Sequence, residues 1–410
     1  MSTSVFSYLS ALNKAPLRRL FYFLLFTFSF SLHTAAQQDS CHLRISLLTC
    51  SPGEELYSTF GHTALRVTDN TTGTDYVFNY GTFEFDPDFY VKFIRGKLLY
   101  YLSVQPFDEF VYSYQWESRS IAEQVLKLSC EEKQQLFAAL QENARQENKY
   151  YLYDFLFDNC TTRPKNIIAQ NTSTPVTFHN ILPDEKPTFR NLIHTYLDRG
   201  GQYWSKLGID ILLGARLDKK VTNEQAMFLP DFLMKGVDNA TVKGHPLATP
   251  SQTILQMPSP LNQGSLFRPA VVFGLLLVLA LALYFIRARW ATTALSVLDF
   301  LLFFSLGLAG LLLLFMWWGT DHKVTQNNFN LLWALPTHVV VAFVAFQNKK
   351  WVKTYFKATF LISLLLLLSW AFLPQQLNTA LIPLVILIIF RSWHLSKQAT
   401  YAAKTSSVSA

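Results

Sequence analysis

Residues 60–80 have the sequence FGHTALRVTDNTTGTDYVFNY, in which two runs rich in β-branched and aromatic residues flank a polar segment with a glycine. Such runs, at 62–68 and 76–80, are typical of β-strands. The segment 70–73 between them has the composition of a tight turn. These features predict an antiparallel hairpin.

The hairpin gives His62 a defined set of neighbours. Side chains alternate along a strand, so His62, Ala64 and Arg66 share one face. If the turn closes symmetrically about Thr72, Asn79 on the partner strand lies opposite or diagonal to Ala64, on the same face as His62. A register shift of one residue would move Asn79 to the other face.

A second segment, YDFLFDNCTTRP at residues 153–164, places Cys160 where a loop becomes a helix. The unpaired N–H groups of a helix start, its macrodipole and the nearby Arg163 and Lys165 all favour a thiolate. The same N–H groups suit an oxyanion hole. We therefore interpret Cys160 as a candidate nucleophile, His62 as its base and Asn79 as the group that fixes the imidazole tautomer.

A structural interpretation of Cys160 stands beside the catalytic one. The chain has four cysteines, at positions 41, 50, 130 and 160. An even number in an oxidising compartment is typical of disulfides. A bridge from Cys160 to Cys50 or Cys130 would favour a non-catalytic protein.

Other elements complete the N-terminal domain. Residues 43–48 form a further predicted strand, and Ser129 with Glu132 opens a predicted helix to about residue 148 in the capping-box pattern. The combination of a hairpin with helices predicts an α+β fold.

The composition indicates a membrane protein. Half of the 410 residues are hydrophobic and 15% are charged, against about 25% charged in soluble proteins. Pro336 and Pro383 interrupt two of the apolar segments, so tilts or kinks are expected there. About five segments approach the roughly 20 residues of a transmembrane helix, at 269–286, 298–318, 331–346, 360–373 and 377–390.

The charges that flank these segments set the orientation. Loops after the first, third and fifth segments carry Lys and Arg, including Arg287, Lys349 and Arg391, whereas the loops 319–330 and 374–376 have almost none. By the positive-inside rule the C-terminus is cytoplasmic and the N-terminal domain periplasmic. The basic residues in the loops beside the apolar segments therefore account for the net charge of +7. No nucleic-acid partner is expected.

The N-terminus has the layout of a secretory signal peptide. Lys14, Arg18 and Arg19 precede an apolar run at 20–32 and small residues at 34–36; a retained amphipathic anchor is the alternative. We expect localisation in a bacterial inner membrane. The predicted segments are a signal peptide at 1–36, a periplasmic domain at 37–244, a linker at 245–265, a five-helix transmembrane domain at 266–393 and a cytoplasmic tail at 394–410.

Several polar residues are candidates for substrate binding. Arg66 and Arg119 either bind a phosphate or pair with carboxylates in the fold, and Asp158 stands two residues before the candidate nucleophile. The loop after the second apolar segment holds His322, Asn328 and Asn330 beside an interfacial Trp pair. It forms either a headgroup or lipopeptide site, or an interfacial loop with helix caps. No metal-ligand motif is present in the sequence, and no cofactor is expected.

Six segments resemble the Lnb-type lipoprotein N-acyltransferases. The order of a His-bearing strand before a Cys-bearing helix is also similar to the circularly permuted papain-like, NlpC-related superfamily. The similar segments are FGHTALRV, VFNYG, RSIAEQ, YDFLFDNCTT and MFLPDFL in the N-terminal domain and GTDHKVTQNNFNLLW in the membrane half.

The resemblance implies a function as well as a fold. It implies that Cys160 is the nucleophile and His62 its base in transfer of an acyl chain through a thioester. The donor is a membrane glycerolipid, either a phospholipid or the lipoprotein's own diacylglyceryl group, and the acceptor is the N-terminal cysteine amine of a lipoprotein. Two alternatives remain, an NlpC-related cell-wall amidase or peptidase and a non-catalytic membrane-anchored binding protein.

Overall fold

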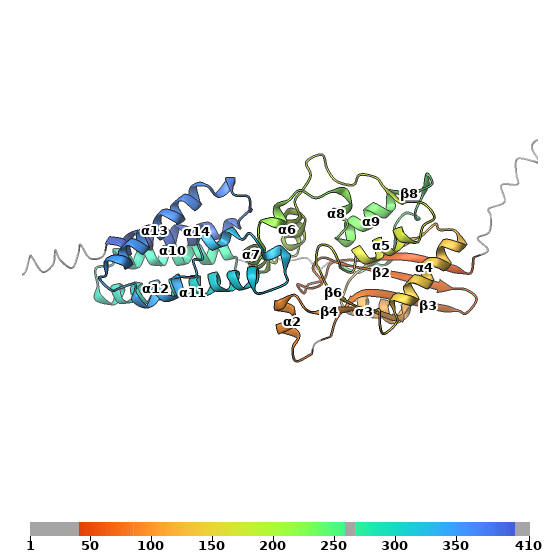
Figure 1. Ribbon diagram of the computed structural model, residues 1–410, viewed down its shortest axis with the longest axis horizontal. Helices are drawn as coiled ribbons and strands as arrows, with labels where there is room; N and C mark the ends of the chain where they lie inside the picture. Colours follow the sequence, from red (N-terminus) through yellow and green to blue (C-terminus); the bar gives the residue numbers. More distant parts are fainter. Residues whose placement is uncertain (1–40, 85, 259–266, 398–410) are drawn as a thin grey trace, which may run out of the picture.

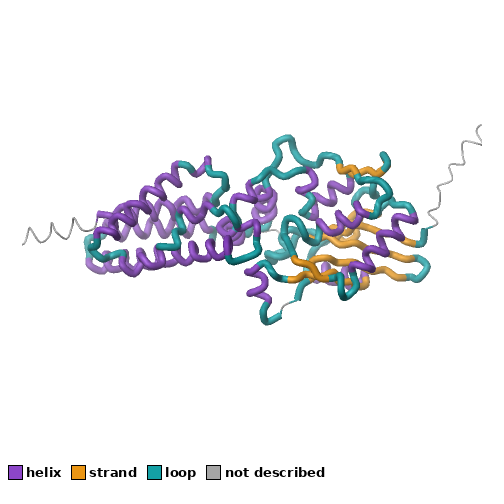
Figure 2. The backbone as a smooth tube through the Cα atoms, in the orientation of Figure 1, coloured by secondary structure: helices purple, strands orange, loops and turns teal. Residues whose placement is uncertain are grey.

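The computed structural model describes residues 41–84, 86–258 and 267–397. The predicted signal peptide at 1–36, the last seven residues of the predicted linker and the tail beyond residue 397 lie outside these residues. The chain forms an elongated molecule with all its described strands in one half and a bundle of helices in the other (Figures 1 and 2).

A mixed domain contains a seven-stranded sheet within the described part of residues 41–258, and its neighbouring strands are antiparallel. The strand order is β10-β5-β1-β2-β3-β4-β6. These strands are β1 (Leu43–Cys50), β2 (His62–Asp69), β3 (Thr74–Thr82), β4 (Leu99–Pro106), β5 (Ile121–Val125), β6 (Tyr150–Leu152) and β10 (Gln252–Leu255).

The central hairpin has the predicted register. Arg66 on β2 pairs with Val77 on β3, and Leu65 pairs with Phe78. The next step of this register sets Ala64 opposite Asn79. His62 and Asn79 therefore share a face at the end of the hairpin, as the turn length predicted.

Helices cover both faces of the sheet. On one face, α3 (Phe107–Trp116) packs Phe110 and Tyr114 onto the strands. On the other face lie α4 (Cys130–Asn143), α5 (Thr162–Gln170) and α9 (Pro230–Asp238). The capping box of Ser129 and Glu132 is confirmed. The helix ends five residues earlier than predicted because the side chain of Asn148 donates a hydrogen bond to the Glu142 carbonyl and holds a turn there.

Several smaller elements complete this half. They are α2 (Phe89–Arg95), α6 (Phe189–Arg199), α7 (Tyr203–Leu212), the 3₁₀ helix η1 (Ala215–Asp218), α8 (Asn223–Ala226) and a small sheet of β7 (Thr177–Phe178), β8 (Ala240–Val242) and β9 (His245–Pro246).

The segment predicted as a linker contributes two strands, β9 and β10. The backbone N–H of Thr249 donates to the Val125 carbonyl, and β10 then pairs with β5. Polar residues and prolines, which suggested a linker, are equally typical of edge strands, and β10 lies at the edge of the sheet. The mixed domain therefore extends beyond residue 244.

The C-terminal half is helical. Among the described residues, three helices have the length and apolar composition of a membrane span, Arg289–Trp318, Lys350–Leu368 and Thr379–Lys397. These correspond to α11, α13, and η6 (Thr379–Leu381) with α14 (Ile382–Lys397). The first predicted span forms α10 (Pro269–Phe285), an apolar helix of 17 residues.

The third predicted span is broken rather than continuous. Around Pro336 the chain forms short turns, η3 (Phe329–Leu332), α12 (His338–Val341) and η4 (Ala342–Val344). This segment packs directly on the backbone of α11, where a Cβ added at Gly307 would lie 2.1 Å from the Val339 nitrogen and one at Gly310 would lie 2.1 Å from the Ala334 oxygen. Irregular backbone is tolerated at membrane depth where protein covers it.

A buried ion pair joins two of the long helices. Arg391 of α14 forms two hydrogen bonds of 2.7 Å with Asp299 of α11, and both side chains are buried. The sequence placed Arg391 in a cytoplasmic loop. The structure corrects this, because the helix continues past Arg391 and turns its side chain toward Asp299.

Candidate active site

His62 and Asn79 face each other across the hairpin of β2 and β3. The Nε2 atom of His62 lies 2.6 Å from the Oδ1 atom of Asn79. Because an amide oxygen only accepts, the His62 Nε2–H donates this bond. The bond fixes the tautomer and leaves the other ring nitrogen, Nδ1, for a second partner.

Cys160 lies beside this pair, at the turn that leads into α5. Its Sγ lies 3.8 Å from the Thr161 hydroxyl, and its charge acts directly on the pKa of His62. Gly81 of β3 fits against both residues, because an added Cβ would lie 3.0 Å from Cys160 Cβ and 3.7 Å from His62 Cε1. The structure thus brings together Cys160, His62 and Asn79, the three predicted catalytic residues.

Gly81 was not predicted from the sequence. Its φ of +91° favours glycine, and its Cα lies where a side chain would displace the thiol. A signal existed in the sequence, since a glycine that follows closely on a strand residue such as Asn79 is typical of a close backbone approach.

Asn159, which was likewise not predicted from the sequence, shapes the turn that carries the Cys160 thiol. Its Oδ1 accepts hydrogen bonds of 2.8 Å from the N–H groups of Thr161 and Thr162. Its Nδ2 donates to the carbonyls of Phe155 and Phe228. The second contact ties the Cys160 turn to the segment before α9. An Asn just before a helix start is the available sequence signal.

The electrostatics of the pair favour a thiolate and an imidazolium. Burial acts to raise the pKa of Cys160, but the positive charge of His62 and the nearby Thr161 hydroxyl outweigh burial and lower that pKa. Burial acts to lower the pKa of His62, but the Cys160 charge and the hydrogen bond to Asn79 raise it. Each group therefore stabilises the charged form of the other.

The oxyanion donors differ from those expected. The N–H groups of Thr161 and Thr162 are occupied by the Asn159 side chain. The N–H of Cys160 itself has no acceptor in the part of the chain that the structure describes. This donor remains for an oxygen that develops negative charge beside the thiol.

Asp158 and Arg163 neutralise each other at the edge of the site. Arg163 Nε lies 2.6 Å from Asp158 Oδ1, and its Nη2 lies 2.8 Å from Oδ2. The guanidinium also stacks on Tyr151, 3.5 Å from the ring centroid. The Arg163 charge thus has a counter-ion other than the thiolate, and the substrate contact of Asp158 stays a prediction.

The two arginines proposed for phosphate binding are also paired. Arg66 forms ion pairs with Asp75 and Glu123 and lies over the Phe107 ring. Pairing with carboxylates in the fold was one of the two alternatives for Arg66.

Arg119 is buried closer to the site. Its Nε donates to the Ser51 carbonyl and its Nη1 pairs with Glu117. Its Nη2 has no partner among the described residues, and its positive charge acts against the rise in the pKa of His62. Arg119 thus supports the loop before His62, with one donor left over.

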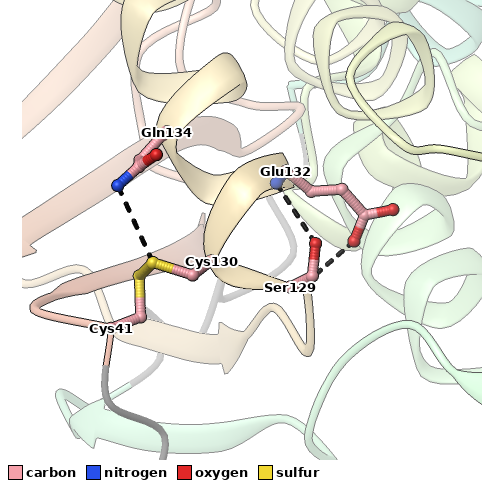
Figure 3. The surroundings of a disulfide bond; sticks show 5 residues. All are labelled: Cys41, Ser129, Cys130, Glu132 and Gln134. Carbon is pink, nitrogen blue, oxygen red and sulfur yellow. Dashed lines mark hydrogen bonds between the residues drawn. A yellow bond between two sulfur atoms is a disulfide. The ribbon is translucent and has the colours of Figure 1, made fainter.

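The cysteines divide into a bridged pair and two free thiols. Cys41 and Cys130 form a disulfide with a Cα–Cα distance of 5.2 Å, next to the Ser129 capping box (Figure 3). Cys50 and Cys160 are free in the described chain. Burial raises the pKa of Cys50 to about 12. The bridge of Cys160 that would have favoured a structural role is not formed.

The loop at 319–330 joins the two halves of the molecule. The Asn328 and Asn330 side chains are buried, and both donate to carbonyls at the end of α7. His322 Nε2–H donates to the Phe93 carbonyl. These side chains are occupied by protein groups, which agrees with the alternative of an interfacial loop with caps. The headgroup or lipopeptide site at this loop stays a prediction.

A second set of polar contacts strengthens this junction. Asp210 of α7 binds Arg190 and His194 within the mixed domain, and Asn378 of the membrane half donates to its other oxygen. A cavity of about 280 Å³ lies beside these groups. It is lined by residues of α6, α7, the start of α10 and the segment before α14, and Cys160 is not among them.

Among the described residues, no cluster of three His, Cys, Asp or Glu side chains has the geometry of a metal site. The chemistry available at Cys160 is that of a thiol, an imidazole and an amide.

Two family models match the chain. The Lnb N-terminal periplasmic domain matches residues 30–194, and the Lnb transmembrane domain matches residues 261–401. No curated protein and no solved structure matches it. The mixed half is therefore a periplasmic domain, and the helical half is a transmembrane domain.

Proposed function

Because the chain belongs to the Lnb-type family, we propose that it is a membrane-bound lipoprotein N-acyltransferase. The donor is an ester of a membrane glycerolipid. The acceptor is the α-amine of the N-terminal cysteine of a diacylglyceryl-modified lipoprotein. A thioester on Cys160 connects the two half-reactions, and this chemistry needs no cofactor.

In the first half-reaction the Cys160 thiolate attacks the ester carbonyl, with the thiol proton held on His62. The carbon–oxygen bond of the ester breaks, and His62 gives its proton to the departing alcohol. The products are an acyl-Cys160 thioester and a lysolipid. The N–H of Cys160 stabilises the negative oxygen of the tetrahedral intermediate.

In the second half-reaction the lipoprotein amine attacks the thioester carbonyl. His62 takes the amine proton, the carbon–sulfur bond breaks, and an amide forms while Cys160 leaves as the thiolate. The balance is one ester and one amine converted to one amide and one alcohol. Because both substrates are lipid-anchored, the membrane half serves to keep the site at the surface where they lie.

One observation carries this proposal, the 2.6 Å bond between His62 Nε2 and Asn79 Oδ1 beside a free Cys160. That bond occupies Nε2 of His62 and leaves Nδ1 as the ring nitrogen that can take the thiol proton, as a general base requires. The lowered pKa of Cys160 supports a nucleophile whose thiolate persists to lower pH than that of an ordinary cysteine.

We infer the finer architecture on the same basis. The His62 strand precedes the Cys160 helix, which supports a circularly permuted papain-like, NlpC-related arrangement of the periplasmic domain. In the membrane half, α10 and the broken segment at 331–346 would bring the crossings to five. The flanking Lys and Arg residues support a cytoplasmic C-terminus, and we propose that the protein lies in the inner membrane.

The thioester is the direct test of this function. Full-length protein in lipid nanodiscs would be incubated with a phospholipid that carries a radiolabelled acyl chain. We expect label on the wild type that hydroxylamine removes and none on Cys160→Ala. Absence of label from both the wild type and a slowed His62→Ala variant would contradict a thioester mechanism. Release of muropeptides instead would favour the amidase alternative.

A further inference from the structure

The short helix α2 (Phe89–Arg95) exposes large apolar side chains. Val91 is 56% exposed, Phe93 52% and Ile94 43%. Lys92 and Arg95 lie among them. Exposed apolar residues interspersed with basic ones are typical of helices that lie in a membrane interface.

Contacts with the membrane half fix the position of α2 relative to the membrane helices. The His322 Nε2–H donates to the Phe93 carbonyl at 2.9 Å, and the Asp321 N–H donates to the Arg95 carbonyl at 3.0 Å. The His322 ring also packs against Gly96, 3.3 Å from an added Cβ.

These donors stand just after the end of α11. The last residue of α11, Trp318, is 73% exposed and pairs with Trp317. Exposed Trp residues at the end of a membrane span mark the boundary of the bilayer. The helix α2 is therefore held at the periplasmic surface of the membrane, between the two halves of the molecule (Figure 1).

A row of aromatic rings runs from α2 toward the nucleophile. The Phe93 ring lies 6.2 Å from that of Phe89, Phe89 lies 5.7 Å from Phe83, and Phe83 lies 5.2 Å from Tyr100. We call Phe93, Phe89, Phe83 and Tyr100 the aromatic row.

The inner end of the aromatic row lies at the active site. Phe83 follows two residues after Gly81, whose Cα packs on Cys160. Burial and the charge of Cys160 raise the pKa of Tyr100 to about 12, which agrees with a position close to the thiol.

We propose that α2 lies in the periplasmic leaflet of the membrane. We also propose that the aromatic row guides the acyl chain of the donor lipid from the bilayer to Cys160. The exposed apolar side chains of α2 thus contact the phospholipids of the membrane. The inference rests on the proposed acyl transfer, because it assigns the path by which the donor ester reaches the thiol.

Rates of Cys160 acylation, measured with two acyl donors, test the proposed path of the acyl chain. Full-length protein in phospholipid nanodiscs would be assayed for acylation of Cys160 by a bilayer phospholipid and by p-nitrophenyl butyrate from solution. For Phe93→Glu, we expect the ratio of the bilayer rate to the soluble rate to fall at least about tenfold. Tyr112 is 66% exposed and belongs to α3, a helix that lies farther from the membrane helices than α2 does (Figure 1). Tyr112→Glu should leave that ratio unchanged.

A direct contact measurement covers the case in which Phe93→Glu fails to fold. Ile94 would be replaced by the photo-cross-linker p-benzoylphenylalanine and irradiated in nanodiscs that contain radiolabelled phospholipid. Lipid cross-links from position 94, and none from the same substitution at Tyr112, are the expected result.

The outcomes separate this inference from the function on which it rests. An unchanged rate ratio for Phe93→Glu together with no lipid cross-link at position 94 would overturn the role of α2. If neither donor acylates wild-type Cys160, that result would instead count against the thioester. The cross-link would still report whether α2 contacts lipid.

Discussion

The Nε2 atom of His62 lies 2.6 Å from the Oδ1 atom of Asn79 on the adjacent strand. The two side chains come from opposite strands of one hairpin, so the hydrogen bond is built into the sheet itself. It orients the imidazole before any substrate arrives, and a preorganised base is more effective than one that must be ordered during the reaction.

Loss of the Asn79 side chain should weaken the base without unfolding the domain. We expect Asn79→Ala to lower the rate of Cys160 acylation by a soluble ester about 10- to 100-fold, which is less than the full contribution of about 10²–10⁴ made by general-base catalysis because His62 itself remains. Asn79→Gln, which retains the amide, should recover part of the rate. Wild-type rates in Asn79→Ala would show that Asn79 does not position His62.

The pH dependence of alkylation should reveal the ion pair. Since the pKa of Cys160 is lowered from its ordinary value of 9.0, the thiolate persists to lower pH and iodoacetamide should label Cys160 well below pH 9. In His62→Ala burial remains but the positive charge is lost, so the midpoint should move upward.

Peptide mapping by mass spectrometry separates the two free thiols. Cys50, whose pKa burial raises to about 12, should stay unlabelled over the same range and serves as the internal control. Identical alkylation midpoints for Cys160 in the wild type and in His62→Ala would contradict the pairing.

A side chain at Gly81 should damage the site. Gly81→Ala places a Cβ 3.0 Å from that of Cys160 and at a φ of +91°, a strain of about 1–3 kcal/mol for a non-glycine residue. Gly73→Ala is the matched control, since it has a φ of +71° but no atom within 4 Å of the added Cβ. Both should lower the melting temperature, and Gly81→Ala alone should slow acylation at least about tenfold.

The disulfide should contribute stability but not chemistry. Cys41 and Cys130 are 89 residues apart, and removal of a native disulfide typically costs about 2–5 kcal/mol. Urea unfolding of the Cys41→Ala/Cys130→Ala variant should show a loss in that range while Cys160 alkylation is retained. Loss of alkylation in a variant that remains folded would link the bridge to the site.

The buried Asp299–Arg391 pair should behave as a coupled unit. Removing either partner leaves an uncompensated charge, at a cost of about 3–5 kcal/mol. We expect Asp299→Leu or Arg391→Met to lower the thermal stability in detergent sharply, and the double variant to recover most of it. Additive losses in the double variant would show that the two side chains act independently.

The central part of the candidate site follows from local sequence. The alternation of side chains from His62 onward and a short turn fix the face of the hairpin, and the register observed in the structure agrees with both. The start of α5 just after Cys160 likewise depends on nearby residues. Such short-range patterns can be predicted because the side-chain periodicity of a strand, and likewise that of a helix, is the same in any protein.

The remainder depends on contacts between distant segments. Arg66 and Asp158 have the chemistry of ligand-binding residues, but their partners are decided by which carboxylate or guanidinium folding brings beside them. Asn330 bonds to α7 carbonyls that are distant in sequence. Similarly, the segment at 331–346 is apolar enough to span a membrane, and only its packing on Gly307 and Gly310 explains its broken path.

The most direct test of the central claim is the mass of a lipoprotein N-terminus. Wild type and Cys160→Ala would be expressed in a bacterium depleted of its own lipoprotein N-acyltransferase, and N-terminal lipopeptides of an abundant lipoprotein would be weighed. We predict that only the wild type adds an acyl chain to the terminal amine. A lyso-form lipoprotein would identify its own glycerol as donor, whereas a triacyl form would indicate a separate phospholipid. Unmodified diacyl lipopeptides from both strains, with both proteins correctly inserted, would contradict the account.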